Sequence, residues 1–457
     1  MSLQKSLGKH RIRNFTPIIL LSFLVAVFAG SGLLALPVSS AEGVPHSYLD
    51  ALFTATTSVC VTGLVTVPTV SAWSGFGQAV ILVLIQIGGL GIITCMTAFL
   101  LFFHQKAGLG QRLLIQEALN LNSLSGILGF LKRILLGTFA VEGICALLYM
   151  IVFVPEYGYR GVWISVFHSV SAFCNAGLDL ISENSLCPYS QNSLLLSVTS
   201  AEIILGGIGF VVWWDVIRVL RERKQKRGRC LSRLTLHSKI ALSMTFILLI
   251  GGTAAFLILE YRNPETLGPL SFLEKIQVAA FQSVTTRTAG FATVPQESLT
   301  AGSWLLTLIL MCIGGSPVGT AGGIKTVTIA VLLASARAAI QNKEETTCFE
   351  RSISKEATRK ALGVVCSFLI IVLLSALLLA AATGADAEDV LFESVSAAGT
   401  VGLTRGLTGT LNDIGKLIVS ATMFLGRVGP ISLAIVFLKQ KNKGDGVRCP
   451  TEEVQIG

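Results

Sequence analysis

The sequence contains few of the charged residues that cover the surface of a soluble protein. Asp, Glu, Lys and Arg make up only 13% of its 457 residues, whereas hydrophobic residues make up 52%. Soluble domains carry about 25% charged residues, so a soluble enzyme or binding protein is excluded. The ten cysteines form no Cys-x-x-Cys pair and no cluster with histidine. This absence argues against a disulfide framework and against a cysteine-based metal site.

The sequence contains several long hydrophobic runs with few charged residues. Several reach the roughly 20 residues that are needed to cross a hydrocarbon core of about 30 Å. The first run, residues 17–36, is long and lacks a convincing small-residue cleavage site after it, so it does not resemble a signal peptide. The chain is therefore predicted to be an integral membrane protein.

Four copies of one short segment lie along the chain at a nearly fixed spacing. Each begins with Phe and reaches a single glycine nine or ten residues later. The last copy contains Thr-Val-Gly-Leu-Thr, which is close to the Thr-Val-Gly-Tyr-Gly filter run of potassium channels. The four glycines, 114, 113 and 112 residues apart, are Gly63, Gly177, Gly290 and Gly402. Such a period marks an internal repeat and predicts one pore with pseudo-fourfold symmetry.

Each copy lies within the same order of helical patterns. The predicted fold class is an all-α polytopic membrane protein with four pseudo-repeats around one central pore. Each repeat consists of a transmembrane helix, a pore half-helix, a filter loop and a second transmembrane helix. The predicted second helices cover residues 76–103, 194–220, 304–339 and 414–438. The predicted repeats are residues 17–104, 126–220, 236–340 and 360–438, between termini at 1–16 and 439–457.

Basic residues are distributed unevenly over this topology. The two termini and the links between the units hold 27 of the 35 Lys and Arg residues. Because basic loops stay in the cytoplasm, both termini are predicted to be cytoplasmic, and the filter loops to open outward. The outer loops carry acids such as Asp179, Glu183 and Asp389, which predicts a vestibule that attracts cations. Outer loops that only lack Lys and Arg are the alternative.

The filter segments offer ion ligands through their backbone. Carbonyl oxygens bind a dehydrated cation without net charge, so the ion can also leave, and glycine permits the close approach that this requires. The negative C-terminal ends of the half-helices would favour a cation as well. Four structural glycine turns are the alternative. The candidate ion-binding residues are Val61, Thr62, Gly63, Asn175, Ala176, Gly177, Thr288, Ala289, Gly290, Thr400, Val401 and Gly402.

The second helix of the third unit is predicted to be interrupted below the filter. Residues 314–326 contain five glycines and a proline, which a regular helix does not tolerate. They are not a phosphate-binding loop, because Ile324 precedes Lys325 and no strand leads into them. Glycine pairs at 88–89 and 206–207 are interpreted as close helix packing. The predicted gate consists of Gly314, Gly315, Ser316, Pro317, Gly319, Gly322, Gly323 and Lys325.

Arg427 lies in the equivalent region of the fourth unit, where a charge is a functional hypothesis by default. It is predicted to donate hydrogen bonds to carbonyl groups of residues 314–326 and to hold the gate shut. The alternative is an ion pair with Glu142 or Glu202. For these two acids, helix packing is favoured over a proton or Na⁺ relay.

Two further polar residues lie beside the filter segments. Arg287 would repel a cation if it faced the pore, so it is predicted to lie behind the filter and to pair with an acid such as Glu393. His168 is predicted to be buried and not to act as a ligand.

Together these motifs resemble the Trk/Ktr/HKT superfamily of potassium transporters. The resemblance rests on the four units, on the Thr-Arg-Thr-Ala-Gly-Phe run ending at Phe291, on residues 314–326 and on Gly-Arg-Val-Gly-Pro at 426–430. It covers nearly the whole chain. The first unit follows the N-terminus directly, so the chain is most similar to the Ktr-type ion-translocating subunit.

The resemblance implies K⁺ uptake through a channel-like, K⁺-selective pore in the plasma membrane. Loop 314–326 would be its gate, with Arg427 in contact with it, and a cytosolic nucleotide-binding ring would open it. The family also implies a homodimer with one pore in each protomer. The basic linkers 218–239 and 337–360 would dock the ring, or equally set the topology or contact anionic lipids.

Other readings of the same pattern remain open. A pore that admits Na⁺ comparably is one, and Na⁺ could also activate or couple to K⁺ uptake. A substrate-carrying secondary transporter is another, although it would show inverted repeats. No enzyme activity, covalently bound cofactor or nucleic-acid partner is expected, because the sequence shows no nucleophile–base pair or metal cluster.

Overall fold

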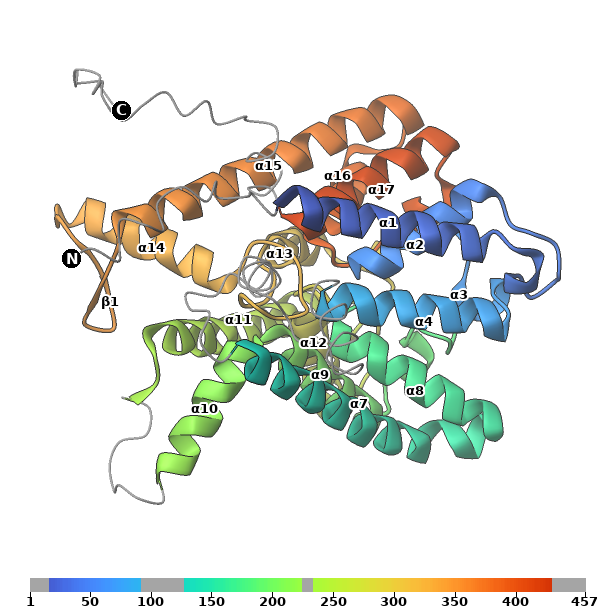
Figure 1. Ribbon diagram of the computed structural model, residues 1–457, viewed down its shortest axis with the longest axis horizontal. Helices are drawn as coiled ribbons and strands as arrows, with labels where there is room; N and C mark the ends of the chain where they lie inside the picture. The colour runs from blue at the N-terminus through green and yellow to red at the C-terminus, as the bar shows by residue number, and fades with distance from the viewer. Residues whose placement is uncertain (1–15, 92–126, 224–232, 430–457) are drawn as a thin grey trace, which may run out of the picture.

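The computed structural model describes residues 16–91, 127–223 and 233–429, which fold almost entirely into helices (Figure 1). A long helix, a short helix and a broken or shorter helix follow one another four times. The four-repeat architecture predicted from the sequence is therefore confirmed. The predicted terminal segments up to residue 15 and from 439 onward lie outside the described residues, as do residues 92–103 and 430–438 of two predicted second helices.

The first helix of each unit is long and apolar enough to cross a membrane. In the described part of the chain, these are the four single helices that meet this requirement. They expose large apolar side chains, such as Leu147 on the second and Leu377 on the fourth, as expected of surfaces that face lipid tails. The four helices are α1 (Thr16–Leu34), α7 (Ile127–Tyr157), α11 (Leu236–Glu260) and α15 (Lys355–Thr383).

The second helix of each unit is too short to cross. The longest has 16 residues, which span about 24 Å. Serine caps start two of them: Ser47 accepts a hydrogen bond from the Asp50 backbone, and Ser271 forms a capping box with Glu274. These half-helices are α2 (Tyr48–Cys60), α8 (Tyr159–Cys174), α12 (Phe272–Thr285) and α16 (Ala387–Gly399).

In the described residues, the helix after each filter loop stops within two residues of a glycine. Gly91, Gly209 and Gly429 have φ angles of 85°, 92° and 92°, which side chains other than glycine rarely adopt. At Gly209 the chain turns by 97° between two helices. The segments are α4 (Gly75–Leu90), α9 (Ser193–Gly207) with α10 (Phe210–Arg223), α13 (Ala301–Cys312) with α14 (Thr326–Ile340), and α17 (Asp413–Val428).

The sequence predicted an interruption in the third unit only. The predicted continuous helices over 76–103, 194–220 and 414–438 are wrong, because Gly91, Gly209 and Gly429 are not helical. The packing interpretation of the paired glycines holds as well. A β-carbon at Gly89 would overlap Cys174, and one at Gly206 would overlap the Phe173 carbonyl oxygen. The same glycine clusters thus bring helices close together and precede the point where each helix stops.

The four units form a closed ring. The segment after each filter packs against the half-helix of the next unit: α4 against α8, α9 against α12, α13 against α16, and α17 against α2. The last of these contacts joins the end of the chain to its beginning, the red and blue ribbons of Figure 1. Lys416 Nζ and Asp50 Oδ1, 2.7 Å apart, form an ion pair across it. The most completely buried aromatic residues include one Phe from each half-helix, at 53, 167, 281 and 392.

A short hairpin and several short helical turns lie at the two ends of the bundle. Strands β1 (Thr346–Cys348) and β2 (Arg351–Ile353) form an antiparallel hairpin, with Thr346 opposite Ile353. This hairpin joins α14 to α15 at the left of Figure 1, and the turns into the half-helices α8 and α16 lie at the right. The remaining helical turns are α3 (Thr69–Ala72) and the 3₁₀ turns Pro37–Ser39, Cys187–Tyr189, Gln296–Ser298 and Leu407–Thr410.

Candidate functional site

The four predicted filter glycines meet at the centre of the ring. A β-carbon added to Gly63, Gly177 or Gly290 would lie only 2.7, 2.7 or 2.5 Å from a carbonyl oxygen, and one added to Gly402 would overlap an oxygen. Only glycine permits this approach. In each case the oxygen belongs to the next unit: Ala176 for Gly63, Ala289 for Gly177, Val401 for Gly290 and Thr62 for Gly402. The last contact closes the ring.

The backbone of each filter segment has the same unusual conformation. Its first residue has a positive φ angle, which costs a residue other than glycine about 1–3 kcal/mol. The φ angle of the second residue is not positive, and that of the glycine is positive again, at 67–102°. The first residues and their φ angles are Val61 at 56°, Asn175 at 58°, Thr288 at 71° and Thr400 at 50°. Four segments far apart in the sequence thus share one strained backbone conformation.

Backbone hydrogen bonds to the half-helices hold this conformation. The residue before each glycine donates its N–H to a carbonyl oxygen five residues back, or four in the third unit, at 2.8–3.0 Å. Such bonds use carbonyl groups that a helix end leaves without a partner. The four donor and acceptor pairs are Thr62 and Thr57, Ala176 and Ser171, Ala289 and Thr285, and Val401 and Ser396.

The same four acceptor residues also brace the filter with their hydroxyl groups, a role that the sequence interpretation missed. Thr57 and Ser396 accept from the filter glycine of their own unit, at 3.0 and 3.1 Å. Ser171 and Thr285 instead donate to the carbonyl oxygen of the residue after the glycine, at 2.5 and 2.7 Å. The signal was present in the sequence, because each hydroxyl lies four residues after the Phe of its copy.

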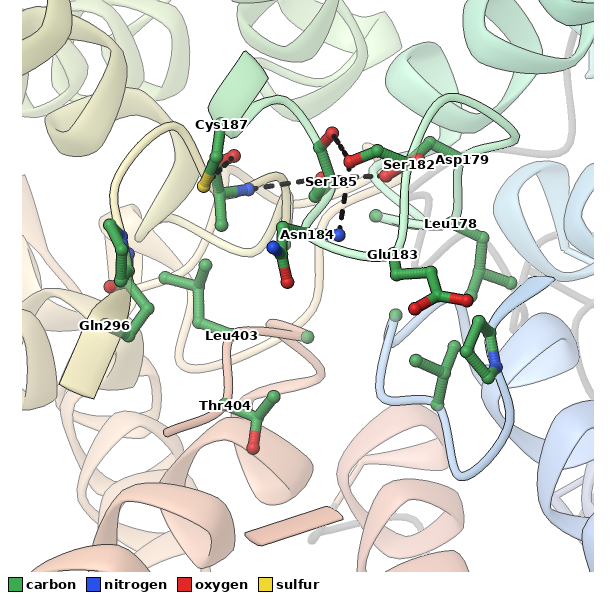
Figure 2. Close-up of a pocket in the computed structure, with 18 of the residues that line it drawn as sticks. Leu178, Asp179, Ser182, Glu183, Asn184, Ser185, Cys187, Gln296, Leu403 and Thr404 are labelled. Atoms are coloured by element: carbon green, nitrogen blue, oxygen red, sulfur yellow. Dashed lines mark hydrogen bonds between the residues drawn. The ribbon is translucent and has the colours of Figure 1, made fainter. Parts of the chain in front are cut away.

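A cavity of about 340 Å³ opens on one side of the glycine ring and is lined by all four glycines. Its walls carry Asp179, Glu183 and Glu297, and none of its described lining residues is Lys or Arg. Figure 2 shows Asp179 linked to Ser185, whose hydroxyl donates at 2.7 Å. Burial raises the pKa of Asp179, and this hydrogen bond opposes the rise. We call this cavity the vestibule; its negative charge suits a cation.

On the other side of the glycine ring, the third unit opens into an irregular segment between α13 and α14. It returns on itself, since Gly314 N–H donates to Ile324 O at 2.9 Å and Ile324 N–H to Cys312 O at 3.1 Å. It also touches two filter segments: Gly322 N–H donates to Thr288 Oγ1 at 3.3 Å, and Gly322 lies directly against Thr400. The predicted gate residues therefore lie directly beneath the predicted filter.

The carbonyl groups at the end of α9 hold this irregular segment in place. Ser316 N–H donates to Gly207 O at 2.8 Å, and Thr320 N–H donates to Gly206 O at 3.1 Å. These are carbonyl groups that the break in the second unit releases from helical pairing. The break in one unit thus provides the acceptors for the loop of another.

Arg427 binds this loop from the fourth unit. Its Nη1 donates to Thr320 O and its Nη2 to Gly88 O, each at 2.6 Å, so one side chain joins units one, three and four. The hydrogen bond that the sequence predicted is present. Lys325 lies nearby and donates to Ala321 O at 2.6 Å and to Gly322 O at 3.3 Å.

The alternative partners of Arg427 are engaged elsewhere. Glu142 accepts from Gln86 Nε2 at 3.0 Å. Glu202 accepts from Ser169 at 2.6 Å and from Tyr149 at 2.9 Å, and so joins three helices of the second unit. His168 is fully buried, as expected, and contacts Thr199 at 3.1 Å.

The predicted pair of Arg287 and Glu393 is wrong. Glu393 accepts from the hydroxyl groups of Thr404, at 2.8 Å, and Thr408. Arg287 is buried without an acceptor for its Nε atom. Two threonines of the loop after the filter thus donate the hydrogen bonds that the Glu393 carboxylate needs. The spacing of charges along the sequence does not reveal this arrangement.

Comparison with known proteins places these features in a family. A family model described as TrkH, cation transport protein, matches residues 10–446. The potassium/sodium uptake protein NtpJ of Enterococcus hirae is 39% identical over 98% of this chain and 99% of its own length. The Ktr system potassium uptake protein B of Bacillus subtilis is 40% identical over the full length of both chains. The crystal structure of the potassium transporter TrkH from Vibrio parahaemolyticus has a TM-score of 0.74 at 17% identity, and the alignment covers 94% of this chain and 86% of that one.

Proposed function

Because the chain belongs to the TrkH family of cation transport proteins, we propose that it carries K⁺ into the cell through the pore that its four units enclose. The observation that carries this proposal is the closed ring in which every filter glycine touches a carbonyl oxygen of the next unit. Main-chain oxygens at such a ring replace the hydration shell of an ion. The names of NtpJ and of the Bacillus protein, both of which include potassium uptake, support K⁺ as the ion.

In this proposal the selectivity filter consists of the glycines and the two residues before each. The ions that leave the vestibule would pass from carbonyl to carbonyl along these segments. The half-helices add the partial negative charge of their C-terminal ends. No side-chain charge is needed, which lets the ion bind and leave quickly.

A pathway that also admits Na⁺ is the second candidate, because the name of NtpJ includes sodium as well as potassium. One experiment addresses both. The gene would be expressed in a bacterium that lacks its own K⁺ uptake systems, and growth would be measured at low K⁺ with and without Na⁺. Rescue that needs no Na⁺ supports a K⁺ pathway. A chain that reaches the membrane and restores no K⁺ uptake would overturn the proposal.

We further propose that residues 314–326 gate this pore and that Arg427 stabilises the closed arrangement. The position of the loop against Thr288 and Thr400 supports this role, because an ion that leaves the filter would meet it next. The Arg427→Ala variant and a deletion of residues 314–322 are both expected to raise K⁺ flux. If neither does, the loop is not the gate. Arg405→Ala, on the vestibule side, is the matched control.

The charge distribution supports an orientation in the plasma membrane. We place the vestibule outside the cell and both termini in the cytoplasm, because the links that carry most Lys and Arg lie at the opposite end. A homodimer with a cytosolic nucleotide-binding ring completes the proposal. The basic segments 218–239 and 337–360 are the candidate docking surface for this ring. Cross-linking of a cysteine at Glu345 to the co-expressed ring would test it.

A further inference from the structure

Arg287 is more deeply buried than the other basic side chains near the predicted gate, and it differs from them in its contacts. Lys325 and Arg427 each donate hydrogen bonds to carbonyl oxygens. Arg287 is 8% exposed, its Nε atom has no acceptor, and among the described residues no ion pair engages it. A guanidinium that is removed from water without an acceptor or a counter-charge is strongly unfavourable. A bound group from outside the described protein would compensate for it.

A small cavity lies where that group would have to be. It has a volume of about 20 Å³ and is lined by the end of α9, by α11, by the end of α12 and by Gly315 of the predicted gate. Arg287 and Thr245 provide its polar side chains, and the other side chains in its wall are aliphatic. Thr245 is 6% exposed, and its hydroxyl also has no partner. Two unsatisfied polar groups thus line one small cavity.

We propose that this cavity binds one small monovalent anion, chloride in the cell, between the Arg287 guanidinium and the Thr245 hydroxyl. Both groups can donate hydrogen bonds to it, and the described wall of the cavity contains no carboxylate that could neutralise the arginine. One water molecule needs about 10–15 Å³ of such space, so a single monatomic ion fits and a phosphate group does not. Water would satisfy the hydrogen bonds but leave the charge uncompensated.

The position of the anion would give it a structural effect on the gate. Arg287 directly precedes the third filter segment, and Gly315 lies near the start of the irregular loop. Gly315 also approaches the end of α9, since an added β-carbon would lie 2.6 Å from Gly207 O. An anion here would hold filter, loop and α9 together from behind the pore. Binding itself does not depend on the proposed function; only an effect on K⁺ flux would rest on it.

Bromide is a direct probe, because it resembles chloride and scatters X-rays anomalously. Crystals of the full-length protein grown in bromide are expected to show one anomalous peak beside Arg287. Crystals grown in gluconate should lack it. A peak in ordinary density without anomalous signal would mean that one water molecule occupies the cavity, and it would overturn the proposal, as would an empty cavity at saturating bromide.

Thermal unfolding in detergent provides a second readout that does not require crystals. Exchange of gluconate for bromide at constant ionic strength is expected to raise the unfolding midpoint of the wild-type protein by about 1–4 °C. Thr245→Val should reduce this shift and Arg287→Gln should abolish it. Thr253→Val, on the same helix but outside the cavity wall, should keep it. An undiminished shift in both cavity variants would contradict the site, and Thr245→Val alone decides if Arg287→Gln does not fold.

Discussion

The two sides of the glycine ring follow opposite rules. On the filter side, the four units share the same features. Each has a glycine, a first residue with a positive φ angle, a backbone hydrogen bond to the half-helix and a hydroxyl group that braces the filter. On the other side, in the described residues, the helices of three units stop beside a single glycine with φ of 85–92°, whereas the third unit has an irregular segment of 13 residues, 313–325, between α13 and α14. A spherical ion on the axis requires carbonyl oxygens at the same distance from every unit. A barrier needs only one segment that can move.

This contrast also separates the kinds of interaction involved. The filter is held within each unit, since its braces come from the preceding half-helix. The loop is held between units, by α9 of the second and Arg427 of the fourth. In the proposed mechanism, local bonds keep the filter in place, while movements of the neighbouring units release the loop.

The largest expected effect comes from breaking the fourfold filter at one glycine. In Gly402→Ala the new β-carbon would overlap Thr62 O, so the ring must open. We expect K⁺ uptake to fall by about 100-fold, which corresponds to roughly 3 kcal/mol. Gly63→Ala, with 2.7 Å to Ala176 O, should retain more activity.

Uptake measured at matched membrane levels tests this order. Gly409→Ala is the control, because nothing lies within 4 Å of its added carbon. Equal activity of Gly402→Ala and Gly409→Ala would show that the glycine ring is not the ion path.

The next largest effect concerns the contact between units. Arg427→Lys keeps the charge but loses the two-pronged guanidinium, so it can hold Thr320 O or Gly88 O but not both in the same way. We expect K⁺ flux without the cytosolic ring to rise about 5- to 30-fold, as one or two hydrogen bonds of about 1 kcal/mol each are lost. Flux into proteoliposomes would measure it. Flux at or below the wild-type level would indicate that the arginine does not restrain the loop.

A smaller effect should distinguish the hydroxyl braces from one another. Thr57→Val leaves the buried Gly63 N–H without an acceptor, whereas Ser171→Ala removes a donor from Leu178 O. Orphaned N–H groups are rarer than under-satisfied carbonyl groups. We expect Thr57→Val to cost about 1–3 kcal/mol of stability and Ser171→Ala less. Thermal unfolding of both variants in detergent gives the order, and the reverse order would contradict this account.

The smallest effect is electrostatic. Glu183→Gln combined with Glu297→Gln removes two charges from the vestibule wall but leaves the filter intact. We expect the K⁺ uptake rate to fall about 2- to 3-fold at low ionic strength and to match the wild type at high salt, where charges are screened. Glu345→Gln, in the exposed link after α14, is the control. A loss that does not depend on salt would mean that these side chains do more than attract ions.

The sequence sufficed for the parts of the molecule that repeat. Four aligned copies revealed the units, the half-helices and the glycine of each filter, because a repeated pattern tests itself. The prediction that Arg427 reaches the carbonyl groups of 314–326 was also correct in its contact with Thr320. A charge inside a membrane has few partners to choose from, and an interrupted helix offers free carbonyl groups.

The parts that could not be predicted depend on partners far apart in the chain. Nothing near Arg287 in the sequence shows that Glu393 is satisfied by Thr404 and Thr408. The break at Gly209 was missed because a glycine pair in a membrane helix has two meanings, close packing and a stop. Only the φ angle, which depends on the tertiary contacts of the loop, separates them.

The contact between Lys416 and Asp50 joins residues 366 positions apart, and this sets a limit on how the protein can be made. The first unit leaves the ribosome long before the fourth is synthesised. Until then, the side of α2 that packs against α17 has no partner. A chain that stops before α17 would lack the helix that covers this side of α2, and the polar groups of α2 would face lipid. Closure of the ring is therefore among the last events of biosynthesis.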